Sequence, residues 1–229
     1  MDSGSSASED AEPEFKIVVL GNGAVGKTSL IKRYCEDGFG QSYKQTIGLD
    51  FYSKKVDVPG FRSVRLQIWD IGGQQIGGSM LANYVHGADA ICFVYDVTNP
   101  ASFKDIEEWH ECVLALLAKE KGRKPLMVLV GNKTDLPNRQ VSAEMHAQAA
   151  DAYNMRPLLI SACSGDRINS LFMMLAAKLA GVGISQQELD LTNRVVVSID
   201  SVPDERTPAF RASETGGKRK KVDDKCELM

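Results

Sequence analysis

The chain lacks the features that mark membrane-spanning and disulfide-bonded proteins. No run approaches about 18 apolar residues, so we expect no transmembrane helix. The five cysteines are an odd number and are scattered without the spacing of a zinc site or a disulfide framework, which suits a reducing compartment. The three histidines are isolated, so we expect them to be surface or packing residues. The opening residues contain no apolar run, and we expect no signal peptide.

A strong excess of positive charge is also missing. The net charge is −3, and the first 14 residues hold five acids and no base. The nearly neutral remainder gives no electrostatic basis for nucleic-acid binding. Composition predicts a disordered acidic tail over residues 1–14 and a disordered or extended segment over residues 203–229.

Between the tails, apolar runs alternate with segments of helical periodicity. Asn99 and Pro100 are typical of a helix start, and Pro59 and Gly60 predict the turn of a hairpin. The expected strands are 15–20, 49–58, 64–69, 90–97, 126–130 and 158–160, and the expected helices are 27–36, 101–119, 142–152 and 168–180. This alternation predicts an α/β fold with a mainly parallel sheet.

A glycine-rich loop follows the first expected strand and opens the first expected helix. It runs from Gly21 to Thr28 and fits the pattern GxxxxGK[ST]. Its backbone N–H groups can close around phosphate oxygens, helped by the positive potential of the helix N-terminus. Lys27 would then reach the β- and γ-phosphates, and the hydroxyl of Thr28 would ligate Mg²⁺.

The same residues also fit G-x-G-x-x-G, the fingerprint of dinucleotide-binding proteins. That alternative requires an acid about 20 residues further on, at the end of a second strand. Position 41 is Gln41, and the nearest acid, Asp37, lies at an expected helix end. We therefore favour the phosphate loop over a nicotinamide dehydrogenase.

Two further segments extend the expected site. Asp70 ends the strand 64–69 and suits a second carboxylate on the Mg²⁺ side. Gly73 can offer its N–H to the γ-phosphate, and Gln74 can orient an attacking water. These positions predict phosphoryl transfer at the loop.

A third segment, from Asn132 to Asp135, predicts the choice of base. The carboxylate of Asp135 can accept from both N1–H and N2–H₂ of guanine, a pairing that adenine does not offer. Ser161 and Ala162 follow the strand at 158–160, where a backbone N–H can meet the guanine O6. Asn132-Lys133-Thr134 is also a glycosylation sequon, a use that we disfavour without a signal peptide.

In this order, the segments resemble those of Ras-superfamily small GTPases over residues 15–182. Several stretches are similar to signatures of the Rab family, and the glycine-rich continuation after Asp70 is similar to the divergent Rab branch numbered twenty-eight. The Rab-like stretches are 47–51, 66–69, 84–88 and 94–98. The resemblance implies a P-loop small GTPase fold in a single domain over residues 15–182, with a mainly parallel six-stranded sheet and helices on both faces. It also implies a C-terminal hypervariable tail over residues 183–229.

The resemblance also assigns roles. Thr46 is implied to ligate Mg²⁺ and to sense the γ-phosphate, Phe39 to pack against guanine, Tyr43 to close over the phosphates, and Gly23 to leave room for an activating arginine. The implied catalytic residues are Gln74, Lys27 and Thr46, and the implied metal ligands are Thr28, Thr46 and Asp70. The implied GTP/GDP-binding residues are Gly21, Gly23, Ala24, Val25, Gly26, Lys27, Thr28, Ser29, Phe39, Tyr43, Thr46, Gly73, Asn132, Lys133, Asp135, Ser161, Ala162 and Cys163.

Two positions depart from the family pattern. Cys163 stands where a lysine is usual, which is expected to weaken the packing on guanine. Gly72 stands where an alanine is usual, which is expected to loosen the second switch. Gly72, Gln75 and the glycines that follow keep open an alternative function, a GTP-binding scaffold with little or no hydrolysis, whereas Gln74 and Gly23 favour hydrolysis.

The resemblance further implies a switch mechanism and its partners. Residues 38–46 contain no arginine, so hydrolysis is expected to be slow and to depend on an activating protein in trans. The implied partners are an exchange factor, a GTPase-activating protein and effectors that bind segments 38–51 and 70–86. We expect a monomer that acts in vesicle or endosomal traffic.

The C-terminus fits a prenylation signal, Cys226-Glu227-Leu228-Met229, in which the final methionine favours farnesyl. A basic patch precedes it, formed by Lys218, Arg219, Lys220 and Lys221. One prenyl chain with a basic patch gives reversible attachment to the cytoplasmic face of membranes, and a prenyl-binding chaperone is implied. Endosomal, Golgi or ciliary membranes fit the family. The alternatives for the basic patch are nuclear import and a merely solvated tail.

Overall fold

The computed structural model describes residues 12–36, 45–73, 80–119, 122 and 124–193. The chain divides into two units, 1–195 and 196–229, and the second lies outside the described residues. Among the helices of the described part, none is both long and apolar enough to cross a membrane.

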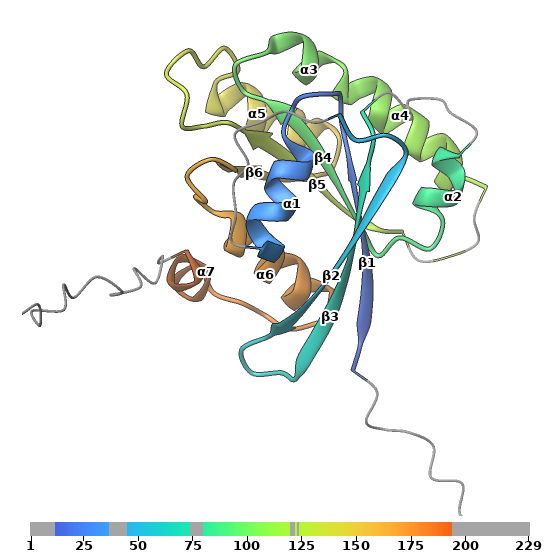
Figure 1. Cartoon of the computed structure of the whole chain (residues 1–229), viewed down its shortest axis with the longest axis vertical. Helices are drawn as coiled ribbons and strands as arrows, with labels where there is room; N and C mark the ends of the chain where they lie inside the picture. Colours follow the sequence, from blue (N-terminus) through green and yellow to red (C-terminus); the bar gives the residue numbers. More distant parts are fainter. Residues whose placement is uncertain (1–11, 37–44, 74–79, 120–121, 123, 194–229) are drawn as a thin grey trace, which may run out of the picture. The chain divides into compact units, whose positions relative to one another are not determined.

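A six-stranded sheet forms the centre of the first unit (Figure 1). Its strands are β1 (Glu14–Leu20), β2 (Leu49–Asp57), β3 (Ser63–Ile71), β4 (Ala90–Asp96), β5 (Leu126–Asn132) and β6 (Arg156–Leu159). Their spatial order is β2-β3-β1-β4-β5-β6, and only the β2–β3 pair is antiparallel. The predicted hairpin and the mainly parallel sheet are therefore confirmed.

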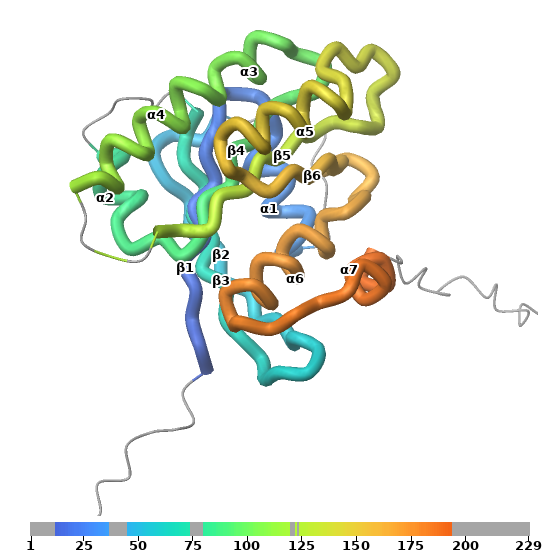
Figure 2. The backbone as a smooth tube through the Cα atoms, turned by 180° about the vertical axis from the view of Figure 1, so that it is seen from behind, coloured from blue at the N-terminus to red at the C-terminus, as the bar shows by residue number. Residues whose placement is uncertain are grey.

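Helices cover both faces of this sheet. They are α1 (Lys27–Glu36), α2 (Leu81–Val85), α3 (Pro100–Lys104), α4 (Ile106–Leu117), α5 (Ala143–Ala152), α6 (Ile168–Leu179) and α7 (Gln186–Thr192). Figure 1 shows α1 in front of the sheet, and Figure 2 shows α4 and α5 across the opposite side. The parallel strands direct their carboxyl ends toward one edge of the sheet, where the loops that carry functional groups lie.

The core consists of two hydrophobic clusters, one on each face. Alternate residues of β1 divide between them, with Ile17 and Val19 in one and Val18 and Leu20 in the other. Side chains of a strand point to opposite faces in turn, so a strand buried on both faces needs a continuous apolar run. This requirement explains the apolar sequence that predicted β1.

Some boundaries differ from the expected ones. The expected limit between tail and domain, after residue 14, falls inside β1, which begins at Glu14. Glu12 pairs with Lys55 and Arg65 at 2.8 Å each, so these last tail residues are bound to the sheet. At the other end, α7 lies within the segment expected to be a tail.

The long helix expected over residues 101–119 is divided into α3 and α4 at Asp105. Asn99 caps α3 as predicted, since its Oδ1 accepts from the N–H of Ala101 at 3.0 Å and of Ser102 at 3.4 Å. The break lets the carboxylate of Asp105 reach Asn22 in the loop after β1.

Candidate functional site

The loop between β1 and α1 has the backbone shape of a phosphate cradle. Gly21 and Gly26 have φ values of 136° and 95°, and Ala24 has a φ of 62°. A Cβ on Gly21 would overlap the carbonyl of Val94, and one on Gly26 would lie 2.5 Å from Nδ2 of Asn132. Glycine is therefore required at both positions by conformation and by space.

Lys27 folds back over this loop. Its Nζ donates to the carbonyl oxygens of Gly21 at 2.7 Å and Asn22 at 2.8 Å, and the side chain is buried. Burial lowers the pKa of Lys27 to about 8, while the charge of Asp70 opposes that shift. The cation thus lies at the centre of the loop, where a bound phosphate would neutralise it.

Three oxygen-bearing side chains from separate segments meet beside this lysine. The hydroxyl of Thr28 donates to Asp70 Oδ2 and lies 2.7 Å from the hydroxyl of Thr46, whose own distance to Asp70 Oδ2 is 3.5 Å. Asp70 is fully buried, and desolvation raises the pKa of its carboxyl group. Hydroxyl and carboxylate oxygens beside a phosphate site fit Mg²⁺, which prefers hard oxygen ligands.

The glycines after β3 bring the two expected switch segments together at the phosphate loop. The N–H of Gly72 donates to the carbonyl of Gly48 at 2.9 Å, and a Cβ on Gly72 would lie 2.8 Å from the carbonyl oxygen of Thr46. A Cβ on Gly73 would lie 2.6 Å from the carbonyl oxygen of Asn22. Glycine at these positions permits close backbone approach between the segments.

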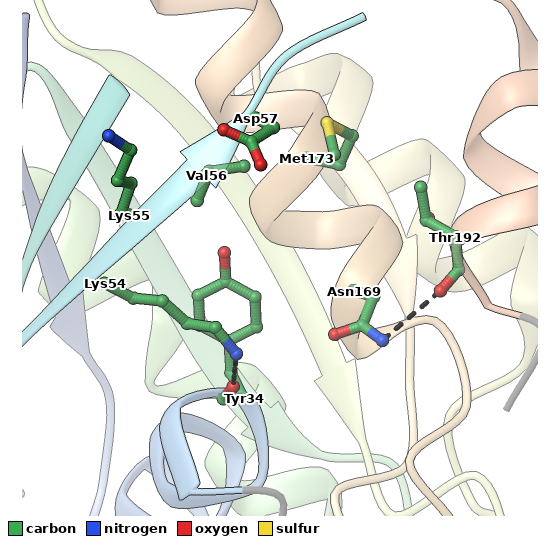
Figure 3. A pocket seen from close by; sticks show the side chains of 8 residues that line it. All are labelled: Tyr34, Lys54, Lys55, Val56, Asp57, Asn169, Met173 and Thr192. Atoms are coloured by element: carbon green, nitrogen blue, oxygen red, sulfur yellow. Dashed lines mark hydrogen bonds between the residues drawn. The ribbon is translucent and has the colours of Figure 1, made fainter. Parts of the chain in front are cut away.

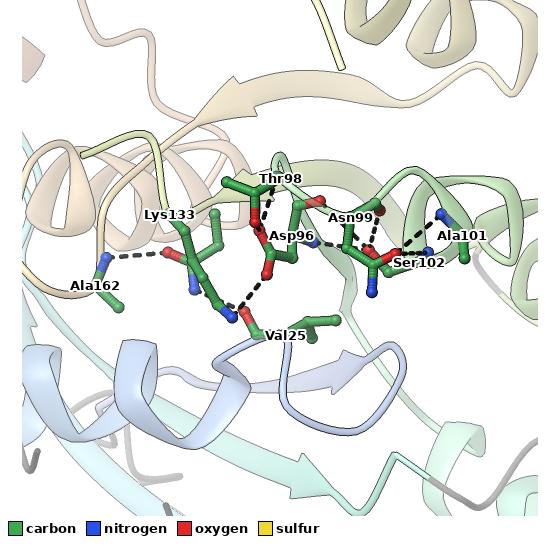
Figure 4. Close-up of polar contacts among 9 residues, drawn as sticks. Val25, Asp96, Thr98, Asn99, Ala101, Ser102, Lys133 and Ala162 are labelled. Atoms are coloured by element: carbon green, nitrogen blue, oxygen red, sulfur yellow. Dashed lines mark hydrogen bonds and ion pairs between the residues drawn. The ribbon is translucent and has the colours of Figure 1, made fainter. Parts of the chain in front are cut away.

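The loops that are expected to bind the base are tied to the glycine loop after β1 by one buried side chain. Asn132 donates through Nδ2 to the carbonyl of Val25 at 2.9 Å and accepts through Oδ1 from the N–H of Ala162 at 3.0 Å (Figure 4). Its side chain is 1% exposed. Asn132 therefore fixes the spacing between the phosphate and base ends of the site.

The neighbouring charged residues are also held in place. Lys133 pairs with Asp96 at 2.7 Å, and Asp96 also accepts from the hydroxyl of Thr98 at 2.7 Å (Figure 4). Burial of Asp96 raises its pKa, but the bonds from Lys133 and Thr98 outweigh this, so the pKa is lowered. The carboxylate of Asp135 accepts from the hydroxyl of Ser161 at 2.5 Å, which links the loop after β5 to the loop after β6.

The predicted residues that the structure describes therefore lie at or after the carboxyl ends of β1, β3, β5 and β6, except for Thr46, which precedes β2 and contacts Thr28. Ser29 lies in the first turn of α1, and Cys163 is exposed in the loop after β6. Phe39, Tyr43 and Gln74 lie outside the described residues. The same holds for Cys226 and for the basic patch at Lys218, Arg219, Lys220 and Lys221.

Sequence reasoning missed several residues that support the site. Asp96 pairs with Lys133, and Asn22 contacts Asp105 and Trp109 on the far side of the phosphate loop. The partners of Asn22 are 83 and 87 residues away along the chain, so no local pattern signals these contacts.

A pocket of about 260 Å³ lies elsewhere, between α1, β2, α6 and α7 (Figure 3). Its wall includes Lys54, which donates to the carbonyl of Tyr34, and Asn169, which donates to the carbonyl of Thr192 at 3.2 Å. These groups are engaged within the protein, and none of the predicted site residues lines the pocket.

A glycine loop between β1 and α1, two segments that adjoin it at Thr46 and Gly73, and linked loops after β5 and β6 form the arrangement of a P-loop nucleotide-binding protein. The Ras family model matches residues 16–181, and the chain belongs to the Ras family, the small GTPases that act as GTP-binding switches. It is similar to Ras-related protein Rab-28 of Caenorhabditis elegans, with 40% identity over 194 residues that cover 83% of this chain and 78% of the relative.

Proposed function

We propose that this Rab-like protein binds and hydrolyses GTP and acts as a membrane-associated switch in vesicle or endosomal traffic. The observation that carries the proposal is the contact of Thr46 with Thr28 and Asp70. Thr46 belongs to the first switch segment, while the other two belong to the phosphate loop and β3. A γ-phosphate at this point would hold both switch segments, and its loss would release them.

The described residues supply binding and orientation for this reaction. The backbone of the phosphate loop and Lys27 would hold the phosphates, and the N–H of Gly73 would meet the γ-phosphate. Thr28 and Thr46 would ligate Mg²⁺, and Asp70 would be the carboxylate on the Mg²⁺ side of the site. When bound, Mg²⁺ neutralises phosphate charge. Gln74 would orient the attacking water.

Hydrolysis is proposed to be slow without a partner. An arginine that stabilises the transferred phosphoryl group is worth about 10³–10⁵ in rate, and segment 38–46 offers none. The proposed activating protein would supply it close to Gly23, which is exposed and has no side chain. An exchange factor would reset the switch by releasing GDP.

Effectors are proposed to bind segments 38–51 and 70–86. Their described parts present large apolar side chains to solvent, with Ile47, Phe51 and Met80 exposed by 90%, 53% and 48%. Phe51 packs edge-on against Trp69 with ring centroids 6.0 Å apart. Exposed apolar groups that adjoin a nucleotide-sensing threonine suit partners that distinguish the GTP and GDP states.

The hydrolysis proposal is tested with the full chain loaded with GTP and Mg²⁺. Single-turnover hydrolysis is followed for the wild type and for Gln74→Leu, each with and without an activating protein for Rab-type GTPases. We expect slow wild-type turnover, acceleration by the activator, and loss of that acceleration in Gln74→Leu. Tight GTP binding without accelerated turnover would instead support the GTP-binding scaffold.

Membrane attachment is tested by fractionating cells that express the full chain. We propose that prenylation of Cys226 and the patch of Lys218, Arg219, Lys220 and Lys221 hold the protein on cytoplasmic membrane faces, with a prenyl-binding chaperone as carrier. Cys226→Ser is expected to move the protein into the soluble fraction. A Cys226→Ser protein that stays on membranes would refute the lipid anchor.

A further inference from the structure

The second residue of the phosphate loop is held by α4 through both ends of its side chain. Nδ2 of Asn22 donates to Oδ2 of Asp105 at 2.6 Å. Oδ1 of Asn22 accepts from the indole N–H of Trp109 at 2.9 Å. Trp109 is fully buried, and its backbone N–H donates to the carbonyl of Asp105 at 3.1 Å, so the two partners form one turn at the start of α4.

The backbone of Asn22 lies at the centre of the phosphate site. Its carbonyl oxygen accepts from Nζ of Lys27 at 2.8 Å. A Cβ on Gly73 would lie 2.6 Å from the same oxygen, so the second switch segment rests on this peptide group. The position of one peptide therefore affects both the phosphate-binding lysine and the glycine that would meet the γ-phosphate.

An amide is the group that this arrangement requires. Asp105 offers an acceptor and Trp109 offers a donor, while Asn22 presents one of each. A carboxylate at position 22 would still accept from Trp109, but it would face the carboxylate of Asp105 at hydrogen-bond distance. Like charges at that separation repel strongly in a partly buried site.

We infer that Asn22 is a positioning residue for nucleotide binding, because its amide fixes the phosphate loop to α4 through Asp105 and Trp109. This inference rests on the proposed nucleotide-binding function. It also implies that positions 22 and 105 need one amide and one acid between them. Exchanging the two side chains preserves the bonds from position 22 to position 105 and to Trp109, whereas acids at both positions break the bond between 22 and 105.

The test is a double-mutant cycle on the full chain. The variants are Asn22→Asp, Asp105→Asn and the exchange Asn22→Asp/Asp105→Asn, and the probe is a fluorescent derivative of GDP. We expect Asn22→Asp to release the probe about tenfold faster than wild type, and the exchange to return to within about twofold. Asp105→Asn alone keeps two amides that can still bond, so its rate stays within about threefold.

The exchange separates positioning from a simple charge effect. It places the same carboxylate beside the phosphates as the single variant Asn22→Asp and has the net charge of the wild type. The matched control is Asn99→Asp, which introduces the same charge at the start of α3, where an aspartate can serve as the helix cap, and it is expected to release the probe at the wild-type rate.

The outcomes distinguish this inference from the proposed function. A wild type that does not bind the GDP probe refutes the nucleotide function and the inference with it. A wild type that binds, combined with an exchange variant as fast as Asn22→Asp, refutes the inference alone. If Asn22→Asp does not fold, Trp109→Phe is tested in its place, because this variant removes one hydrogen bond from Asn22. We expect Trp109→Phe to release the probe about threefold faster than wild type. A wild-type release rate in Trp109→Phe would overturn the inference.

Discussion

The backbone of Gly73 lies so close to the phosphate loop that a methyl group on its Cα would overlap the backbone nitrogen of Gly23. These two residues are 50 positions apart in the sequence, and neither has a side chain that could mediate the contact. Their approach brings the second switch segment directly onto the loop that would hold phosphate.

Replacing Gly73 with alanine is expected to prevent this approach. Because the added methyl group meets fixed backbone, the switch segment must move away from the loop. We expect Gly73→Ala to retain GDP within about threefold but to lose at least about tenfold in GTP affinity, measured by competition with fluorescent GDP. Gly183→Ala is the control, since a Cβ there meets nothing within 4 Å. Equal GTP affinity in Gly73→Ala and wild type would contradict the prediction.

Gly72→Ala is expected to act in the same direction but more weakly. The atoms nearest to a Cβ at this position belong to the backbone of the first switch segment: the carbonyl oxygens of Thr46 at 2.8 Å and Gly48 at 3.4 Å, and the nitrogen of Gly48 at 3.5 Å. A small displacement of segment 46–48 would relieve the clash. We expect about a threefold loss of GTP affinity in the same assay, and a larger loss than in Gly73→Ala would be inconsistent with this geometry.

Local patterns in the sequence predicted most of the fold because the strands and long helices have clear periodicity. The helix expected over 27–36 is confirmed as α1, and the hairpin around Pro59 and Gly60 is confirmed by β2 and β3. The short helix α7 was missed although Ser185 and Glu188 form a capping box, because it followed the predicted end of the domain.

The motifs predicted where the candidate site would lie but not how its parts are held together. Thr28, Thr46 and Asp70 were predicted to share one site, and the structure brings their oxygens into contact. The bonds of Asn132 to Val25 and Ala162 depend on the register of parallel strands. That register is fixed by packing across the whole sheet, which no short motif encodes.

Asn132 is expected to be essential for retaining nucleotide. Asn132→Ala leaves the carbonyl of Val25 and the N–H of Ala162 without this partner, and each unpaired buried group costs about 1–3 kcal/mol. We therefore expect GDP to dissociate at least about tenfold faster. Asn169→Ala removes an exposed amide that bonds to Thr192 and serves as the control. A wild-type dissociation rate in Asn132→Ala would show that the two loops are held in place without this residue.

Asp135→Asn is expected to change the preferred base. The asparagine can still accept from Ser161, whose hydroxyl lies 2.5 Å from the present carboxylate. It would, however, offer an N–H toward the base edge, which matches the C2 carbonyl of xanthine rather than the amino group of guanine. We expect at least about a tenfold loss of GDP affinity and a gain for xanthosine diphosphate, measured by competition. An unchanged preference for GDP would contradict the proposed role of Asp135.

His146 is expected to make the folded state sensitive to acid. It is 2% exposed, its Nδ1 lies 2.9 Å from the hydroxyl of Tyr95, and burial, with a smaller contribution from the charge of Arg139, lowers its pKa to about 4. Below an unfolded-state pKa of about 6.5, the unfolded chain binds a proton that the folded chain does not. The free energy of unfolding should therefore fall as the pH drops from about 6.5 to about 4, by roughly 3 kcal/mol from this residue.

The measurement is denaturant unfolding at several pH values for wild type and His146→Gln. Glutamine keeps a group able to bond to Tyr95 but does not titrate, so the variant should lose less stability than wild type over that pH range. Parallel pH profiles for wild type and His146→Gln would show that His146 takes up its proton equally in both states, against the burial that the structure shows.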